Sequence, residues 1–347
     1  MAGIQKALDA GAVPGHISNV CPPGTRAYLL ELGWLECDEG FVTRGGNSSV
    51  MSTAGQSFVN KRRELPMYAV LIDHPHEGVI LWETGSGVDY PTVWGPQLAD
   101  VFARVKYEPK HELKAAIEAT GHKLEDVKKI ILGHMHLDHA GGLDQFLDRK
   151  DIEIWVHDKE LRSAFWSVAT GADVGVYLQH YMDVSGARTT YIGHVKLSLN
   201  WKTFDERTVD FCQGITLHHL PGHTDGLIGM QLNLPESGAF FFISDHCHVI
   251  ENVSQENRNH VACTANMPSS GEMVYRKVGS HGEDADHPAW FQSTQRLKRL
   301  EATTRGRVIP GHDKETFLQL QGEINEGKGY LLLPGTNLLS IIFLAVY

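Results

Sequence analysis

The sequence predicts an α/β protein, and three observations support that prediction. Apolar runs of strand length, such as residues 67–72 and 79–83, are followed by segments with helical periodicity, such as residues 111–120. Histidine or aspartate side chains repeatedly follow the ends of the predicted strands. Glycines accompany them, and glycine lets the backbone pass close to a bound group. We therefore expect strands and helices in alternation, with the chemistry of the protein at the strand ends.

The first half of the chain contains several predicted strands and two helices. Residues 1–25 are rich in glycine and proline and predict an extended lead-in. Strands are expected at residues 28–32, 41–43, 67–72, 79–83, 129–132 and 152–156, with a polar loop over 44–65 and a turn at 73–78. Helices are expected over 111–120, where Gly121 ends the pattern, and over 142–149. Residues 158–205 are rich in aromatic side chains, and this stretch is a candidate for a pocket wall.

The second half repeats the arrangement of strands followed by polar side chains. Strands are expected at residues 215–220, 227–234, 240–243 and 307–309, and a helix over 290–300. Residues 246–289 are polar, have little periodicity and are interpreted as a long insertion. We expect a single domain over residues 1–329. Residues 330–347 form an apolar tail, for which a docked segment, a homodimer contact and an artefact of gene prediction are the alternatives, and we favour a segment outside the shared fold.

Residues 131–142 hold the strongest chemical signal, Ile-Leu-Gly-His-Met-His-Leu-Asp-His-Ala-Gly-Gly. In an extended backbone His134 and His136 point to the same side, and a following helical turn lets Asp138 and His139 diverge toward two neighbouring positions. Imidazoles and a carboxylate in this arrangement suit zinc or a similar divalent ion. The alternative is a histidine-rich surface loop in a chain with 20 histidines. The H-x-H-x-D-H spacing at a strand end argues against that alternative.

This spacing resembles the signature of the metallo-β-lactamase superfamily. The resemblance implies a four-layer αββα sandwich and three further ligands, each after its own strand. The sequence contains His223 in Leu-Pro-Gly-His-Thr, Asp245 at the end of Phe-Phe-Phe-Ile-Ser-Asp, and His312 in Ile-Pro-Gly-His-Asp. The family pattern then implies two divalent metal ions, with Zn²⁺ preferred. Their ligands would be His134, His136 and His223 for the first ion and Asp138, His139 and His312 for the second, with Asp245 bridging both.

Within the superfamily, the chain resembles most the N-acyl homoserine lactone lactonases, which are quorum-quenching enzymes. The similarity covers about residues 68–317. It implies a dinuclear metal hydrolase that opens a cyclic ester by attack of a metal-bridging hydroxide, with Asp138 carrying the proton. Those lactonases have a tyrosine three residues after the bridging aspartate, where this chain has His248. His248, or its neighbour His246, is the candidate to donate a hydrogen bond to the oxyanion in its place, and a solvent-exposed loop histidine is the alternative for His248.

Two other hydrolytic reactions and two further readings remain as alternatives. A lactam or a cyclic carbamate could be the ring that is opened. A glyoxalase II-like thioester hydrolase needs a basic C-terminal cluster, whereas residues 313–347 contain only Lys314 and Lys328. A mononuclear iron persulfide dioxygenase would leave Asp138 and His312 idle, and a non-catalytic scaffold would not need the complete ligand set. The expected partner is thus a small cyclic ester or amide.

Composition excludes several other classes of function. The net charge of −11 argues against a nucleic-acid partner, because phosphate binding requires a basic surface. Cys21, Cys37, Cys212, Cys247 and Cys263 are odd in number and widely spaced, which favours reduced thiols and a cytoplasmic location. The apolar run at residues 338–347 is too short to cross a bilayer, so a membrane anchor is not expected.

Overall fold

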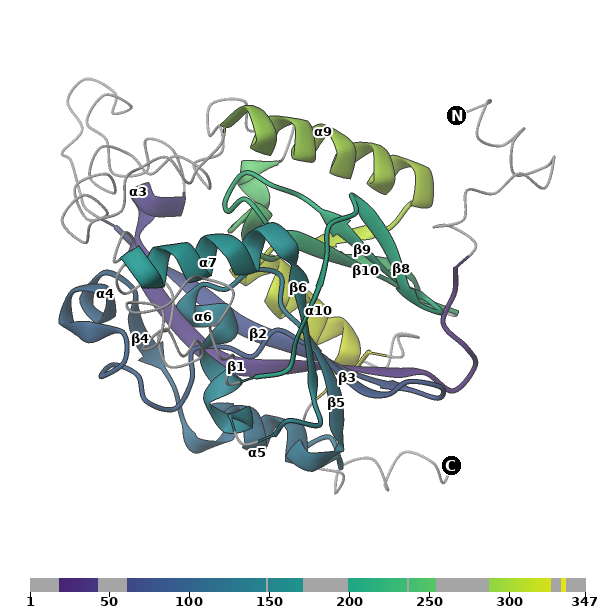
Figure 1. Cartoon of the computed structure of the whole chain (residues 1–347), viewed down its shortest axis with the longest axis horizontal. Coiled ribbons are helices and arrows are strands. Elements are labelled where there is room, and N and C mark those ends of the chain that lie inside the picture. The colour runs from purple at the N-terminus through teal and green to yellow at the C-terminus, as the bar shows by residue number, and fades with distance from the viewer. Residues whose placement is uncertain are drawn as a thin grey trace.

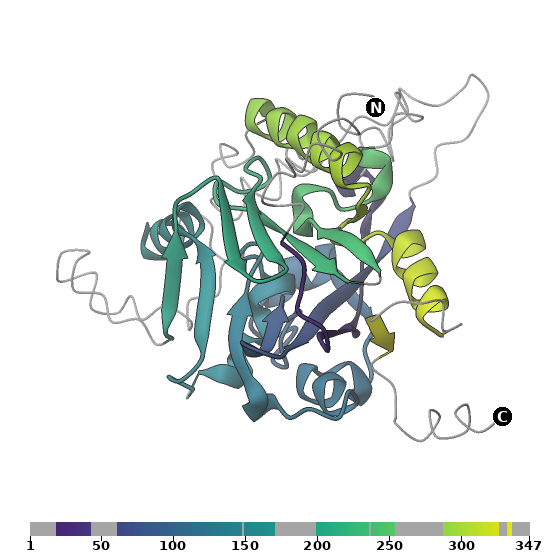
Figure 2. The same ribbon diagram turned by 90° about the vertical axis from the view of Figure 1, so that its right-hand side faces the viewer.

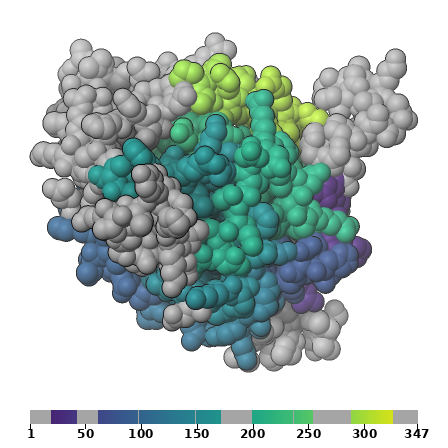
Figure 3. All heavy atoms as spheres, in the orientation of Figure 1, coloured from purple at the N-terminus to yellow at the C-terminus, as the bar shows by residue number. Residues whose placement is uncertain are grey.

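The computed structural model describes residues 19–42, 61–147, 149–170, 199–235, 237–253, 287–325 and 332–334. Two β-sheets lie face to face, with helices on their outer sides (Figure 1). This arrangement is the expected four-layer αββα sandwich. In Figure 2, α9 (His287–Thr304) lies outside the green strands of the second sheet. The space-filling view shows the same helix along the upper edge of the molecule (Figure 3).

The first sheet has eight strands in the described residues, in the order β13-β1-β2-β3-β5-β6-β7, with β4 paired to β1. Its strands are β1 (Arg26–Asp38), β2 (Arg62–His74), β3 (Gly78–Trp82), β4 (Ala103–Lys106), β5 (Val127–Ile131), β6 (Glu153–His157), β7 (Trp201–Phe204) and β13 (Leu332–Pro334). The strands β1, β2 and β3 are antiparallel, whereas β3, β5, β6 and β7 run parallel. Parallel neighbours end at the same edge, so the segments that follow β3 and β5 lie together.

The second sheet has five described strands in the order β12-β11-β10-β9-β8. They are β8 (Thr208–Cys212), β9 (Ile215–His219), β10 (Ile228–Leu234), β11 (Gly238–Phe242) and β12 (Arg307–Ile309). Pairing is antiparallel from β8 to β11, and β11 pairs with β12 in parallel. The residues that follow β11 and β12 therefore emerge at one edge.

Strand β2 explains why the first sheet is buried on both faces. Val70 and Ile72 point into the core between the sheets, where Met230 of β10 also lies. Leu71 points the opposite way, into a second cluster with Ile117 of α5 (Leu113–Glu118). Alternate side chains of a strand face opposite sides, so an unbroken apolar run suits a strand that is covered on both faces.

The helices complete the outer layers. Helices α4 (Gly95–Val101), α5 and α7 (Asp158–Thr170) contribute to the cluster outside the first sheet. Trp290 and Leu297 of α9 pack with Phe241 outside the second sheet. Helix α10 (Lys314–Asn325) inserts Phe317 and Leu320 into the core between the sheets. No helix in the described ranges is long and apolar enough to cross a membrane.

Most predicted strands are confirmed, one predicted element is wrong and one is only partly confirmed. In the segment expected as a strand at residues 41–43, the described residues Phe41 and Val42 belong to a short helix, α3 (Glu39–Val42), because the Asp38 carboxylate accepts the Gly40 N–H at 2.8 Å and turns the chain. The helix expected at 142–149 is present only as a shorter 3₁₀ helix, η4 (Gly141–Phe146). The Gly142 N–H at its start donates to the Gly85 carbonyl oxygen at 3.1 Å, which ties this segment to the loop that follows β3.

Other differences concern elements that the periodicity did not indicate. Periodicity did not indicate α4, β4, β7, β8 or α10, and β2 begins inside the loop expected over residues 44–65. At the start of the apolar tail, β13 pairs with β1, which matches the alternative of a docked segment for those residues. The lead-in over 1–18, the loop over 43–60, the aromatic stretch 171–198, the insertion 254–286 and the tail 335–347 lie outside the described residues. The division into one domain and a tail stays a prediction.

Candidate metal centre

The candidate centre lies where strand ends of the two sheets meet. The motif that follows β5 comes from the first sheet, and the segments after β9, β11 and β12 come from the second. Gly133 permits the contact between them, because a Cβ there would lie 2.5 Å from Ser244 and from the Glu83 carboxylate. His136 is extended, at φ −66° and ψ 161°, and the chain then enters the short helix α6 (Leu137–Ala140). The expected helical turn at Asp138 and His139 is thus confirmed.

One group of three histidines has the spacing of a metal-ligand set. His134, His136 and His223 offer nitrogen atoms that all lie within 4.8 Å of one another. The ring centroids of His134 and His136 are 4.5 Å apart, and His136 Nδ1 lies 3.1 Å from His223 Nε2. His223 comes from the loop between β9 and β10, so the group joins both sheets.

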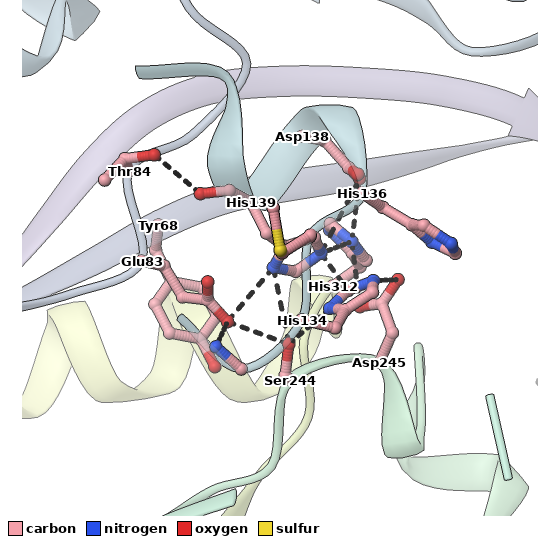
Figure 4. Close-up of polar contacts among 12 residues, drawn as sticks. Tyr68, Glu83, Thr84, His134, His136, Asp138, His139, Ser244, Asp245 and His312 are labelled. Atoms are coloured by element: carbon pink, nitrogen blue, oxygen red, sulfur yellow. Dashed lines mark hydrogen bonds and ion pairs between the residues drawn. The ribbon is translucent and has the colours of Figure 1, made fainter. Parts of the chain in front are cut away.

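A second group combines two carboxylates with two imidazoles. Asp138, His139, Asp245 and His312 also have ligand atoms within 4.8 Å of one another. His312 Nε2 lies 3.2 Å from Asp138 Oδ2 and 3.2 Å from His139 Nε2. Figure 4 shows these side chains converging from α6 and from the ends of β11 and β12.

Asp245 stands between the two groups. Its Oδ1 lies 3.1 Å from His139 Nε2 and 3.2 Å from His312 Nε2. Its Oδ2 faces the other group, 3.6 Å from His223 Nε2 and 3.8 Å from His134 Nε2. A carboxylate with one oxygen toward each group has the geometry of a bridging ligand. The structure therefore brings together all seven side chains that the sequence singled out.

The protonation states of the first group suit a cation. Burial, together with the neighbouring His139 and His136, lowers the pKa of His134 well below its usual value, and burial lowers the pKa of His136 to about 3. Both rings are thus neutral at physiological pH, the form in which imidazole binds metals. His134 Nε2 is buried and has no hydrogen-bond partner in the described part of the chain. A buried acceptor without a donor is costly unless an ion satisfies it.

The second group also suits a cation, in this case because of the negative charge of its carboxylates. Burial opposes the charged forms, yet the carboxylates of Asp245 and Asp138 raise the pKa of His312 to about 10. Asp245 and Asp138 likewise raise the pKa of His139 well above its ordinary value, despite burial. The buried carboxylate of Asp245 and the partly buried carboxylate of Asp138 thus require positive charge beside them, and bound divalent ions can supply it. The donor set of imidazoles and carboxylates fits Zn²⁺ or a related ion.

Glu83 and Ser244 orient two of the histidines, and sequence reasoning missed both. The Ser244 hydroxyl donates to Glu83 Oε1 at 2.8 Å, and His139 Nδ1 lies 3.2 Å from the same oxygen. The Ser244 oxygen in turn accepts from His134 Nδ1 at 3.1 Å. Figure 4 shows Glu83 and Ser244 beside the histidines, with the contacts between them. With Nδ1 of His134 and His139 occupied, Nε2 of each ring is directed at Asp245.

Both orienting residues have strained backbones. Glu83 has a φ of 61° and Ser244 a φ of 47°, values in the left-handed region that residues other than glycine seldom adopt. Such strain persists where the surrounding contacts hold it in place, often at functional sites. The sequence indicated the role of Glu83 only weakly, as a charged residue at a strand end before Thr84 and Gly85.

A pocket opens on the centre and has an apolar side. Among the described residues its walls include Asp138, Asp245, His248 and three of the histidines above, and its apolar lining is Leu65, Trp94, Leu98, Phe102 and Leu137. Most of that lining comes from β2 and from the region of α4. The aromatic stretch expected to form a wall contributes none of the described lining; Phe165 packs on the core and Trp166 is exposed.

The histidines after Asp245 have different surroundings. His248 Nε2 lies 3.2 Å from Asp245 Oδ2, and the His248 ring faces the pocket. His246 instead stacks on Trp290 of α9, and its Nε2 lies 3.0 Å from Thr294 Oγ1. Cys247 is fully buried on the α9 side of the second sheet. The geometry thus brings His248 to the centre, and it gives His246 and Cys247 structural positions.

Comparisons with known proteins agree with this architecture. The sequence profile of the Metallo-beta-lactamase superfamily matches residues 62–232. The N-acyl homoserine lactonase AiiB of Agrobacterium fabrum is 25% identical over 302 residues, which cover 86% of this chain and 96% of that protein. An N-acyl homoserine lactonase of a Bacillus species is 26% identical over 256 residues, covering 73% and 83% of the two chains.

Solved structures have the same fold. An N-acyl homoserine lactone hydrolase with the product N-hexanoyl-L-homoserine at its catalytic metal centre aligns with a TM-score of 0.57 at 20% identity, covering 85% of this chain and 95% of that one. AidC, a dizinc quorum-quenching lactonase, aligns with a TM-score of 0.51 at 14% identity, covering 84% and 88%. Residues 62–232 thus match the metallo-β-lactamase superfamily, and within it the chain resembles the N-acyl homoserine lactonases.

Proposed function

We propose that the protein is a dinuclear metal hydrolase that opens the ring of a lactone of the N-acyl homoserine class. The observation that carries this proposal is Asp245, which directs one oxygen at each of two ligand groups on the floor of a pocket. The relatives that align with this chain over most of their length are N-acyl homoserine lactonases. This similarity supports a lactone as the substrate over a lactam, a cyclic carbamate or a thioester.

We assign the first ion to His134, His136 and His223, and the second to Asp138, His139 and His312, with Asp245 shared. Zn²⁺ suits this donor set. Two divalent ions held by these residues would lower the pKa of a bound water and polarise a carbonyl oxygen. The rest of the chemistry depends on side chains of the chain.

Asp138 is the proposed proton carrier. It lines the pocket, and 18% of its side chain is exposed, against 4% for Asp245. Burial opposes ionisation, but His139 and His312 lower the pKa of Asp138 to about 2, so this carboxyl group is ionised at neutral pH. A lactone that opens must receive a proton on its leaving oxygen. Asp138 is positioned to take a proton from the attacking water and to return it there.

His248 is the proposed donor to the oxyanion that forms on the carbonyl oxygen. Its main-chain oxygen accepts the His312 N–H at 2.9 Å, which fixes His248 relative to the second ligand group. An imidazole N–H held at the pocket wall stabilises negative charge that develops during ring opening. This assignment gives His248 a role that a solvent-exposed loop histidine would not have.

The apolar side of the pocket fits the substituent that an acylated lactone carries. Trp94, Leu98 and Phe102 line the pocket beside Asp138 and His223. A ring whose carbonyl is held at the centre would place its acyl chain against these side chains, and their burial of the chain would add affinity. We also keep three finer predictions as proposals: a small-molecule substrate without nucleic-acid or membrane partners, a homodimer, and a cytoplasmic location.

The test is metal analysis and ring opening in one preparation. We expect two metal ions per chain and consumption of base in a pH-stat with N-hexanoyl homoserine lactone. Asp245→Asn should abolish ring opening, because it removes the charge shared by both sites. Asp210→Asn, a carboxylate of β8 away from the centre, is the matched control and should retain activity. One iron per chain without ring opening would refute the proposal. Turnover of only a cyclic carbamate or only a glutathione thioester would show that the proposed substrate class is wrong.

A further inference from the structure

A buried glutamate outside both ligand groups connects the two loops that carry the first group. Glu160 lies in the first turn of α7 and is completely buried. Its Oε1 accepts the Met135 N–H at 2.8 Å, and its Oε2 accepts the Thr224 hydroxyl at 2.6 Å. The Gly226 N–H also donates to this carboxylate. All three partners are neutral donors, so hydrogen bonds rather than an ion pair hold the carboxylate.

The partners of Glu160 sit beside metal-ligand candidates in the chain. Met135 lies between His134 and His136, and Thr224 directly follows His223. The first segment leaves β5 of the first sheet, whereas the second leaves β9 of the other sheet. One carboxylate therefore joins the two sheets at the point where His136 Nδ1 and His223 Nε2 approach to 3.1 Å.

The packing around Glu160 leaves no room for adjustment. A Cβ on Gly226 would lie 2.1 Å from the Glu160 backbone nitrogen and 2.4 Å from its Cα, so the loop after His223 lies directly on α7. Thr224 is itself buried, with 2% of its surface exposed. Burial raises the pKa of Glu160 to about 7, against the effect of its hydrogen bonds. A buried carboxyl group is costly to retain, and nothing in the proposed reaction uses it.

We propose that Glu160 is a positioning residue that sets the spacing between the His134–His136 segment and His223, and thereby the affinity of the first ligand group for its ion. The inference rests on the proposed metal site, and it deepens it by naming what holds that site together. Groups that orient ligands from outside the metal's own ligand set commonly change metal affinity about 10- to 100-fold when they are removed.

Two variants test this role. Glu160→Gln keeps the shape of the side chain but turns one acceptor into an NH₂ group, which must face an N–H or O–H donor. Thr224→Val removes one donor and leaves Glu160 in place, so it serves if Glu160→Gln does not fold. Thr216→Val is the matched control, because Thr216 is a buried threonine whose hydroxyl donates to a different carboxylate, Asp210, at 2.8 Å.

The measurement is competitive titration of metal-free protein with Zn²⁺ against a chromophoric chelator, followed by absorption spectra of the Co²⁺-loaded protein. We expect Glu160→Gln to weaken one of the two sites about 10- to 100-fold and the other less than about threefold. Thr224→Val should weaken the same site by a smaller factor, and Thr216→Val neither. The Co²⁺ absorption bands then identify the weakened site. If Glu160→Gln loses the bands that His223→Ala also loses, and keeps the bands that Asp138→Asn loses, the weakened site is the first group.

The outcomes separate this inference from the proposed function. Two unaltered affinities in both Glu160→Gln and Thr224→Val would overturn the positioning role while the dinuclear site stands. Equal weakening of both sites, with a lower unfolding temperature of the metal-free variant, would also overturn it, because that pattern reports a general loss of structure. Failure of the unmodified protein to bind two ions would overturn the proposed function and, with it, this inference.

Discussion

His248 is the residue at which this chain departs from the lactonases that it resembles. Its ring lies at the pocket wall, 3.2 Å from Asp245. The family resemblance leads us to expect a tyrosine at this position. Both side chains can donate one hydrogen bond toward the pocket, although imidazole can also carry a charge. The exchange therefore preserves a donor and changes its acidity.

Replacing His248 should distinguish the contribution of its hydrogen-bond donor from that of its aromatic ring. We expect His248→Phe to lower kcat for lactone opening about 100-fold with a smaller change in KM, because a donor to the oxyanion acts in the transition state. His248→Tyr should restore at least a tenth of the activity, since the hydroxyl donates again. Steady-state kinetics with metal content verified for each variant measure this. Equal rates for His248→Phe and the unmodified protein would exclude the proposed role.

Residues of the centre differed in how far the sequence could predict them. His134, His136 and His139 were predictable because their spacing follows directly from extended and helical geometry. Glu83 and Glu160 were not, since a glutamate at a strand end or in a first helical turn is ordinary, and their burial depends on contacts across the two sheets. Ligand identity is local in the sequence, whereas the groups that orient the ligands are defined by the fold.

At the scale of elements, α4 links the outer core of the first sheet to the pocket. The helix is short and begins with Gly95 and Pro96, so the sequence shows no helical periodicity there. It nevertheless places Leu98 both in the outer core of the first sheet and on the pocket. By contrast, long buried strands such as β2 and β10 were predictable, because their apolar runs are continuous. Short elements are determined by what they pack against, so their sequences carry little signal.

Truncation of α4's pocket side chain should act on the acyl part of the substrate. We expect Leu98→Ala to raise KM about 3- to 10-fold for a long-chain acyl lactone and less for a short-chain one, because lost apolar contact area weakens binding by about 1 kcal/mol. Leu318→Ala on α10 is the control, since 45% of Leu318 is exposed. The comparison requires kinetics on an acyl-length series. A uniform change across all chain lengths would point to a disturbed centre instead of a lost acyl contact.

At the scale of the molecule, the two ligand groups connect the sheets. Each group takes side chains from the end of β5 and from ends of strands in the second sheet. Bound ions should therefore oppose separation of the layers, in addition to any role in the reaction. The four-layer arrangement itself was predicted only through the resemblance of the motifs, because periodicity does not specify how sheets stack.

Removal of the metal should lower stability markedly. A ligand at 1,000 times its dissociation constant stabilises the folded state by about 4 kcal/mol, so two ions should raise the unfolding temperature by roughly 10 °C or more. Calorimetry before and after chelation, and again after Zn²⁺ is returned, measures this. Hydrogen exchange should increase most at the ends of β5, β9, β11 and β12. Unchanged melting after verified removal of both ions would contradict the connecting role.

Acid should destabilise the metal-free protein through His157. This buried ring stacks on His219 with centroids 3.8 Å apart, and burial, with His219, lowers the pKa of His157 from 6.5 to about 4. Between these pH values the unfolded chain binds a proton that the folded protein does not, so folding stability falls as the pH falls. His157→Phe keeps an aromatic ring but cannot bind the proton. In urea unfolding, the free energy of unfolding of His157→Phe minus that of the unmodified protein should rise by about 1 kcal/mol for each pH unit as the pH falls from 6.5 to 4. A difference independent of pH would refute this.

The pairing of β13 with β1 has a consequence for how the protein is made. Ala27, Tyr28 and Leu29 pair in parallel with Leu332, Leu333 and Pro334, so one of the earliest strands receives a neighbour from far along the chain. At a translation rate of about 5 to 20 residues per second, that edge waits for roughly 15 to 60 s while the intervening residues are synthesised. During this time an apolar strand with unpaired backbone groups can recruit other strands. Chaperones that cover exposed strands during synthesis should therefore raise the yield of native protein.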